Sequence, residues 1–155
     1  MQKIILLVAT FVFSFQAVTG QADGFQNKSK TELLQFIKDS IETYGNFMGI
    51  DYLVSYADHE PNHLRIGEIS SGDTVWYKVD LSLAKMGASV SILPTGKENF
   101  IITFKKEITT KEKNNKNATL DVFFFRKKDK RETDYAQLIE NFTYAFTFLI
   151  PQCKT

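Results

Sequence analysis

Two segments of the chain repeat apolar residues at helical spacing. The first lies near residues 30–45, where five apolar side chains share one face of a helix. These are Leu33, Phe36, Ile37, Ile41 and Tyr44. Ser29 and Glu32 have the spacing of a capping box, and Gly45 is a natural stop. We predict an amphipathic helix near the N-terminus.

The second helical pattern covers residues 133–150. Its apolar positions follow the series i, i+3, i+4, i+7, i+11 and i+14, and are Tyr135, Leu138, Ile139, Phe142, Phe146 and Leu149. Thr133 or Asp134 can cap its start, and Pro151 is expected to end it. The chain therefore closes with a second amphipathic helix.

Between the two helices, from Ile50 to Phe125, the pattern changes to a period of two. Six segments alternate in this way: "YLVSYA", "HLRIGEIS", "TVWYKVDLSL", "ASVSIL", "FIITFKK" and "TLDVFFFRK". No helical pattern interrupts them, which favours an antiparallel meander over a parallel βαβ sheet. The stretch "TTKEKNNKNAT" is expected to be a polar, mobile loop between two strands.

These patterns predict an α+β fold. We expect a strongly bent antiparallel sheet, or a partly open barrel, of about six strands. The N-terminal and the C-terminal amphipathic helices would pack on it, because their apolar stripes need an apolar sheet face to cover.

The N-terminal residues have the features of a signal peptide. Lys3 is followed by the apolar run "IILLVATFVFSF" and then by small residues in "AVTGQA". The apolar run is too short to span a bilayer as a permanent helix, although a retained anchor helix is the alternative. We predict a signal peptide at residues 1–20 and a single domain at residues 21–155. The mature chain would have no transmembrane segment, and would be exported to the periplasm or the extracellular space.

Composition bears on the class of partner and on disulfide bonding. The 19 Lys and Arg residues nearly balance the 18 Asp and Glu residues, for a net charge of +1. A dedicated nucleic-acid binder normally carries a basic excess, so nucleic acid is not an expected partner. Cys153 is the one cysteine, which precludes an internal disulfide and predicts a free structural thiol.

The segment His59-Glu60-Pro61-Asn62-His63 matches the H-E-x-x-H pattern of zinc proteases. In those enzymes both histidines bind zinc from one face of a helix, and the glutamate is the general base. Pro61 disfavours a helix here by about 3 kcal/mol, so we expect a hairpin loop with Pro61-Asn62 at its tip.

A metal site at this loop remains an alternative. Catalytic zinc needs a third protein ligand, and the chain has no third histidine. Glu68 is available but falls in the next predicted strand. A structural ion held by Asp58, His59, Glu60 and His63 is a further possibility. We expect the segment around His59–His63 to be a solvated, acidic loop.

Two other groups are candidates for binding. The basic cluster "RKKDKR" comprises Arg126, Lys127, Lys128, Lys130 and Arg131. It could contact an anion, a lipid headgroup or an envelope polyanion, but Asp129 and Glu132 dilute its charge, so we expect a solvated turn.

Trp76 alternates with Val75, Tyr77 and Val79 and so lies on the opposite sheet face. If that face meets solvent, Trp76 is a binding anchor. We expect the helices to cover it, which would make Trp76 part of the core.

From residue 63 to 149 the order of elements resembles a known superfold. Short strands precede "VWYKVDLSLAKMGASVSI", then come "NFIITFKK" and "LDVFFF", a polar turn and an amphipathic helix. This order is similar to the pleckstrin-homology-like superfold, particularly GRAM-type and bacterial PH-like domains, in which the C-terminal helix closes one barrel mouth. The chain departs from it in its capped N-terminal helix, in having one strand fewer than the usual seven, and in its export signal.

The resemblance implies a binding scaffold and not an enzyme, and it transfers no functional residue. We expect no cofactor. We therefore expect an exported, non-enzymatic binding or interaction module. The candidate partners are an envelope protein, a lipid headgroup or a small apolar ligand, the last because the chain has 14 phenylalanines. The alternative function is a metal-dependent hydrolase that uses His59, Glu60 and His63.

Overall fold

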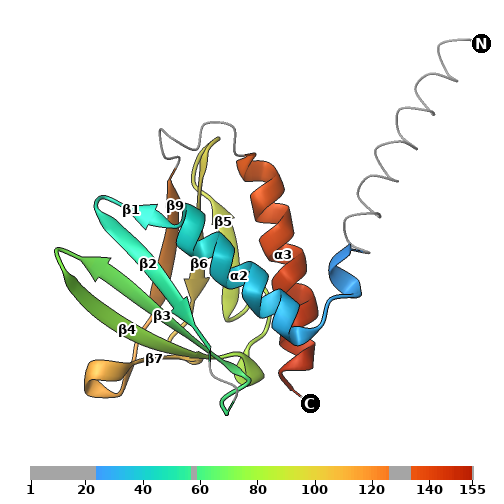
Figure 1. Cartoon of the computed structure of the whole chain (residues 1–155), viewed down its shortest axis with the longest axis horizontal. Helices are drawn as coiled ribbons and strands as arrows, with labels where there is room; N and C mark the ends of the chain where they lie inside the picture. The colour runs from blue at the N-terminus through green and yellow to red at the C-terminus, as the bar shows by residue number, and fades with distance from the viewer. Residues whose placement is uncertain (1–23, 57–58, 126–133, 155) are drawn as a thin grey trace, which may run out of the picture.

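The computed structural model describes residues 24–56, 59–125 and 134–154. The predicted signal peptide (1–20) and the basic cluster (126–131) lie outside the described residues. Within them the fold is α+β, as predicted. One strongly curled, open sheet is covered on a single face by two helices (Figure 1).

The two helices are α2 (Lys30–Tyr44) and α3 (Tyr135–Gln152). The strands are β1 (Asn46–Phe47), β2 (Ile50–Ser55), β3 (His63–Ser70), β4 (Asp73–Asp80), β5 (Val90–Pro94), β6 (Asn99–Phe104), β7 (Thr109–Lys111), β8 (Lys116–Asn117) and β9 (Leu120–Phe125). Two short 3₁₀ helices are η1 (Leu81–Leu83) and η2 (Glu112–Asn114). The strand order is β5-β6-β9-β1-β2-β3-β4-β7-β8.

The sheet differs from the prediction in strand number and direction. The six predicted segments form β2, β3, β4, β5, β6 and β9, but the described sheet has nine strands. The added strands β1, β7 and β8 have two or three residues each, too few to show a period of two. The predicted loop "TTKEKNNKNAT" contains β7, η2 and β8. The sheet is also mixed, because β1 pairs in parallel with β9.

The helix termini follow their capping residues. Ser29 and Glu32 form the predicted capping box at the start of α2. Asp134 caps α3 by accepting a hydrogen bond from the Gln137 N–H. The predicted stop at Pro151 is too early, since α3 ends at Gln152 with Pro151 inside its last turn.

The inner face of the sheet, which carries the buried strand residues, is filled by aromatic packing against the helices. The rings of Phe100 and Phe124 stack at a centroid distance of 4.2 Å. Phe142 of α3 meets Phe124 edge to face at 5.2 Å, and Phe146 continues the cluster along the helix. All four side chains are fully buried. The interior is therefore a packed core, and a small apolar ligand would have to displace these rings.

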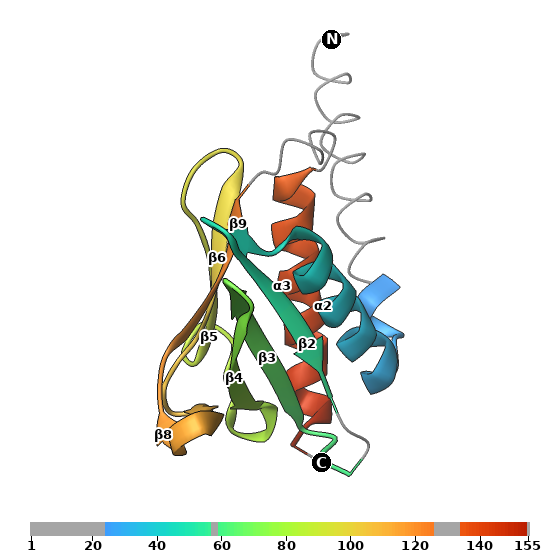
Figure 2. The same cartoon turned by 60° about the vertical axis from the view of Figure 1, so that its left-hand side comes forward.

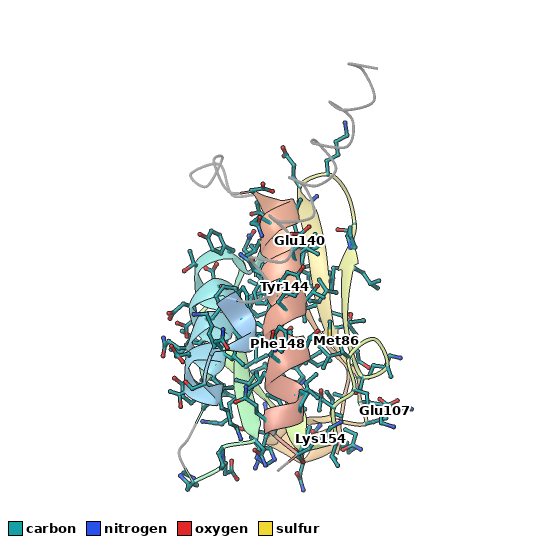
Figure 3. All side chains as sticks on the ribbon, turned by 90° about the vertical axis from the view of Figure 1, so that its right-hand side faces the viewer. Met86, Glu107, Glu140, Tyr144, Phe148 and Lys154 are labelled. Carbon is teal, nitrogen blue, oxygen red and sulfur yellow. The ribbon has the colours of Figure 1, made fainter. Side chains whose placement is uncertain are left out.

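Helices α2 and α3 lie side by side on this inner face (Figures 1 and 2). Figure 3 shows Glu140, Tyr144 and Phe148 along the outward surface of α3. Phe25 stacks on Tyr144, at 6.2 Å between ring centroids, and meets Phe36 of α2 edge to face. None of the helices in the described part of the chain is long and apolar enough to cross a membrane.

Strand β2 separates from β9 beyond the short strand β1, and side chains complete the backbone hydrogen bonding of both strands there. β1 reaches only Ile50 and Asp51 of β2. Farther along, the Tyr52 hydroxyl accepts a hydrogen bond from the Phe123 N–H at 3.2 Å, which a neighbouring strand would otherwise accept. Burial raises the pKa of Tyr52 to about 12.

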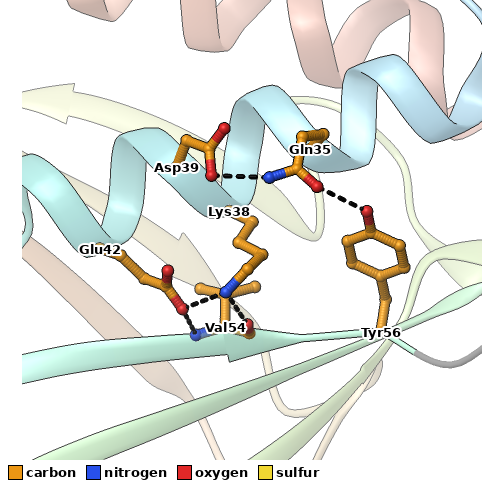
Figure 4. Close-up of polar contacts among 6 residues, drawn as sticks. All are labelled: Gln35, Lys38, Asp39, Glu42, Val54 and Tyr56. Atoms are coloured by element: carbon orange, nitrogen blue, oxygen red, sulfur yellow. Dashed lines mark hydrogen bonds and ion pairs between the residues drawn. The ribbon is translucent and has the colours of Figure 1, made fainter.

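Helix α2 provides hydrogen-bond partners for Val54, the next inward-facing residue of β2 (Figure 4). The Val54 N–H donates to the Glu42 carboxylate at 2.8 Å, and the Lys38 ammonium donates to the Val54 carbonyl at 2.8 Å. Lys38 and Glu42 also form an ion pair with each other. The open seam between β2 and β9 is thus closed by polar side chains of α2 and by one tyrosine.

Candidate functional site

The H-E-x-x-H segment is a turn followed by the first residue of β3. Residues 59–62 have turn or bend geometry, and the His63 N–H donates to the Glu60 carbonyl at 3.0 Å. The Asn62 carbonyl accepts from the Leu81 N–H at 2.8 Å, which fixes the turn against η1. The connection joins the antiparallel strands β2 and β3, as the predicted hairpin loop does. The two imidazoles therefore do not share a helical face.

Strand alternation separates the remaining carboxylate candidate from His63. Residues 63 and 65 of β3 lie on the outer face, and residues 64, 66 and 68 lie on the inner face with the core. Glu68 thus cannot join His63 as a metal ligand. It accepts a hydrogen bond from the Tyr77 hydroxyl, and burial raises the pKa of its carboxyl. Over residues 24–56, 59–125 and 134–154, no three His, Cys, Asp or Glu side chains lie close enough to hold a metal ion.

The outer face of β3 and β4 carries two ion pairs. The Lys78 ammonium contacts the Glu60 carboxylate at 2.6 Å. Arg65 binds Glu112 of η2 with two parallel hydrogen bonds, of 2.6 and 2.7 Å. These contacts lower the pKa of Glu60 and of Glu112, because each cation stabilises the ionised carboxylate. Four charged side chains are therefore held in fixed positions.

Trp76 lies on the same outer face, away from both helices, so the expectation that the helices cover it is wrong. It is half-buried for a local reason. Gly67 faces it across β3 and β4, and a Cβ at Gly67 would come within 3.1 Å of the indole. The glycine lets the ring lie close to the sheet, and the Arg65 guanidinium lies 4.8 Å from its centroid.

Two adjoining hollows open on this surface, and Glu112 lines both. The larger, which we call the outer cleft, has a volume of about 570 Å³. It is lined by His63, Lys78, Asp80, Leu83, Glu107, Ile108, Thr110, Glu112, Asn115 and Asn117. The smaller, of about 520 Å³, is lined by Asp73, Thr74, Val75, Trp76, Glu112 and Lys113. The site is thus built from β3, β4 and the β7–η2–β8 segment.

Close contacts and hydrogen bonds orient the polar side chains of His63, Asp80 and Ser82 at the outer cleft. His63 Nε2 lies 3.6 Å from Asp80 Oδ2, while Asp80 Oδ1 accepts from the Ser82 hydroxyl at 2.6 Å. The serine donates to the aspartate and not to the imidazole, so the imidazole does not activate it as in a catalytic triad. His63 Nδ1 is buried without a hydrogen-bond partner among the described residues. The arrangement offers fixed donors and acceptors for binding.

Sequence reasoning found part of this site. His63, Glu60 and Trp76 were candidates. His63 lines the outer cleft, Trp76 lines the smaller hollow, and Glu60 contacts Lys78 of the outer cleft from the turn. His59 is exposed in the turn. Sequence reasoning missed Arg65, Lys78 and Glu112. Each has the sequence context of an ordinary charged surface residue, and only the folded structure brings it to its ion-pair partner.

Cys153 takes no part in the cleft. Its thiol is buried and free, and burial raises its pKa. Comparisons of the chain with protein-family models, with curated proteins and with solved structures gave no match. The function must therefore be argued from the cleft and the sequence patterns.

Proposed function

We propose that the chain is an exported, non-enzymatic binding module that takes a small polar ligand in the outer cleft. This proposal rests on the two ion pairs at the cleft, Lys78–Glu60 and Arg65–Glu112. Lys78 and Glu112 are lining residues, and each is held by a partner, Glu60 or Arg65. Side chains already fixed before binding lose little entropy when a ligand arrives.

The chemistry of the lining indicates the ligand class. A volume of about 570 Å³ is within the usual range for small-molecule sites. The lining supplies carboxylates from Asp80 and Glu107 and amides from Asn115 and Asn117. These groups match a ligand with several hydroxyl or amino groups. Since the core is filled, we favour this class over a small apolar ligand.

The PH-like order of elements is part of the same proposal, as is export, which rests on the signal-peptide pattern of residues 1–20. The turn geometry of residues 59–62 supports binding over the alternative of a metal-dependent hydrolase. A hydrolase of the H-E-x-x-H type would need His59 and His63 to converge on one ion, and Glu60 to be free as a base. Glu60 is instead engaged by Lys78.

The test is a panel of monosaccharides, amino acids and polyamines, titrated into isotopically labelled protein and followed by two-dimensional amide NMR. We expect at least one class to shift amides of residues 63–65, 78–80 and 110–117. For a monosaccharide or an amino acid, Lys78→Met should weaken binding by at least about tenfold, because a charge-assisted hydrogen bond contributes roughly 1.5–3 kcal/mol. Lys97→Met removes an exposed lysine outside the cleft and is the matched control.

Two results would overturn the proposal. One is binding that shifts only amides remote from the cleft, or no binding by any class. The other is stoichiometric zinc in protein purified without chelator, together with a hydrolytic activity that His59→Ala abolishes. That second result would restore the hydrolase alternative.

A further inference from the structure

The smaller hollow has an indole ring in its wall. Trp76 lines it, together with charged side chains that include Asp73 and Lys113. Two contacts keep the ring in place: it lies so close to Gly67 that a Cβ there would come within 3.1 Å, and the Arg65 guanidinium lies 4.8 Å from its centroid. Because the half-buried ring is already fixed, a ligand that packs against it loses little binding energy to ordering it.

Glu112 connects this hollow with the outer cleft, because it lines both. Its carboxylate is held by the two hydrogen bonds from Arg65, the same residue that contacts Trp76. The volumes of about 570 and 520 Å³ each fall in the range of a separate small-molecule site. The two hollows therefore form one elongated site, which suits a ligand built from two or more linked units.

Each hollow combines an apolar side chain with polar groups. The apolar side chain is Trp76 in the smaller hollow, and in the outer cleft it is Leu83, which is 61% exposed. The amides of Asn115 and Asn117 can both donate and accept hydrogen bonds, and the carboxylates accept them. A sugar ring has matching chemistry, since its C–H groups form an apolar face and its hydroxyls donate and accept around the edge.

The charges of the lining favour a neutral ligand. A lysine stands in each hollow, Lys78 in the outer cleft and Lys113 in the smaller hollow, so a polyamine would meet a like charge in both. A polyanion would likewise meet carboxylates in both, since Glu112 is shared. A free amino acid carries both charges but is too short to occupy two hollows.

We infer that the two hollows together bind a neutral oligosaccharide, with one sugar ring against Trp76 and the next ring in the outer cleft. This inference rests on the proposed function, and it adds the ligand class and a second subsite. Once one ring is bound, binding of the linked ring is intramolecular, so an oligosaccharide should bind more tightly than its monosaccharide.

The test uses the fluorescence of Trp76, which is the only tryptophan of the chain and reports directly on the smaller hollow. The probes are three series of sugars: glucose with cellobiose and cellotriose, glucose with maltose and maltotriose, and N-acetylglucosamine with its dimer and trimer. In at least one series we expect the longer sugars to change the emission and to bind at least tenfold more tightly than the monosaccharide. Amide NMR with the same sugar should show shifts at residues 73–76 and at residues 78–80.

Variants of Trp76 test the second subsite, with affinities measured by NMR because the variants lack the fluorophore. Trp76→Ala should bind the oligosaccharide at least tenfold more weakly and leave the affinity for the monosaccharide unchanged. Trp76→Phe keeps an aromatic ring and should retain most of the affinity. Leu93→Ala is the matched control, because Leu93 is 56% exposed on β5 and lines neither hollow. Circular dichroism checks that each variant is folded.

The outcomes separate this inference from the proposed function. A ligand that shifts amides of the outer cleft, while no oligosaccharide changes the Trp76 emission, would overturn the inference and leave the proposed function intact. Folded Trp76→Ala protein that binds the oligosaccharide as tightly as the wild type would do the same. Failure of every ligand class to bind, sugars included, would overturn both.

Discussion

Replacing Glu42 by alanine tests whether helix α2 completes the hydrogen bonding of β2. The Glu42 carboxylate accepts from the Val54 N–H at 2.8 Å and pairs with Lys38 (Figure 4). Val54 is only 2% exposed, so its amide gains little from water when the carboxylate is removed. The variant therefore leaves a buried donor without an acceptor.

The expected cost follows from two contributions. An unsatisfied buried N–H costs about 1–3 kcal/mol. Loss of the Lys38 ion pair, which is partly exposed, adds about 0.3–0.5 kcal/mol. We expect Glu42→Ala to lower the free energy of unfolding by about 2 kcal/mol in urea titrations. Glu42→Gln keeps a carbonyl acceptor and should lose about half as much.

Asp39→Ala is the matched control on the same helix. Asp39 accepts a hydrogen bond from Gln35 at 2.7 Å but, in the contacts of Figure 4, does not touch the sheet. Its replacement should cost less than about 0.5 kcal/mol, as surface substitutions usually do. If Glu42→Ala and Asp39→Ala lower the stability equally, the carboxylate does not support β2 and the reasoning is wrong.

Two more predictions concern the inner face. Tyr52→Phe removes the acceptor of the Phe123 N–H, so it should lower the free energy of unfolding by about 1–2 kcal/mol and speed hydrogen exchange at that amide. Tyr56→Phe is the control, because the Tyr56 hydroxyl is exposed, and it should have neither effect. Glu68 has a pKa above its ordinary value of 4.5, so the folded state binds more protons and loses stability as pH rises from about 4.5 through the raised pKa. Glu68→Gln should therefore be more stable than the wild type at pH 7, and the difference should vanish at low pH. Urea titrations at pH 7 in which the variant is the less stable protein would contradict the predicted pH dependence.

The candidate site contains residues that the sequence could predict and residues that it could not. Pro61 was enough to predict a turn in the H-E-x-x-H segment, because a proline acts on its own backbone. Glu112 carried no signal, since its role depends on Arg65, 47 residues earlier. Trp76 was assigned to the correct strand face, but the pattern of alternation does not say which face the helices cover.

The sequence by itself determined the local structure of this protein. Its helical stripes, caps and two-residue alternation define α2, α3 and the six longer strands, because each of these signals acts over a few neighbouring residues. Only the tertiary structure decided that β1 pairs in parallel with β9, that the helices share one face, and that Arg65 meets Glu112. Those outcomes depend on contacts between residues far apart in the chain, which no local pattern encodes.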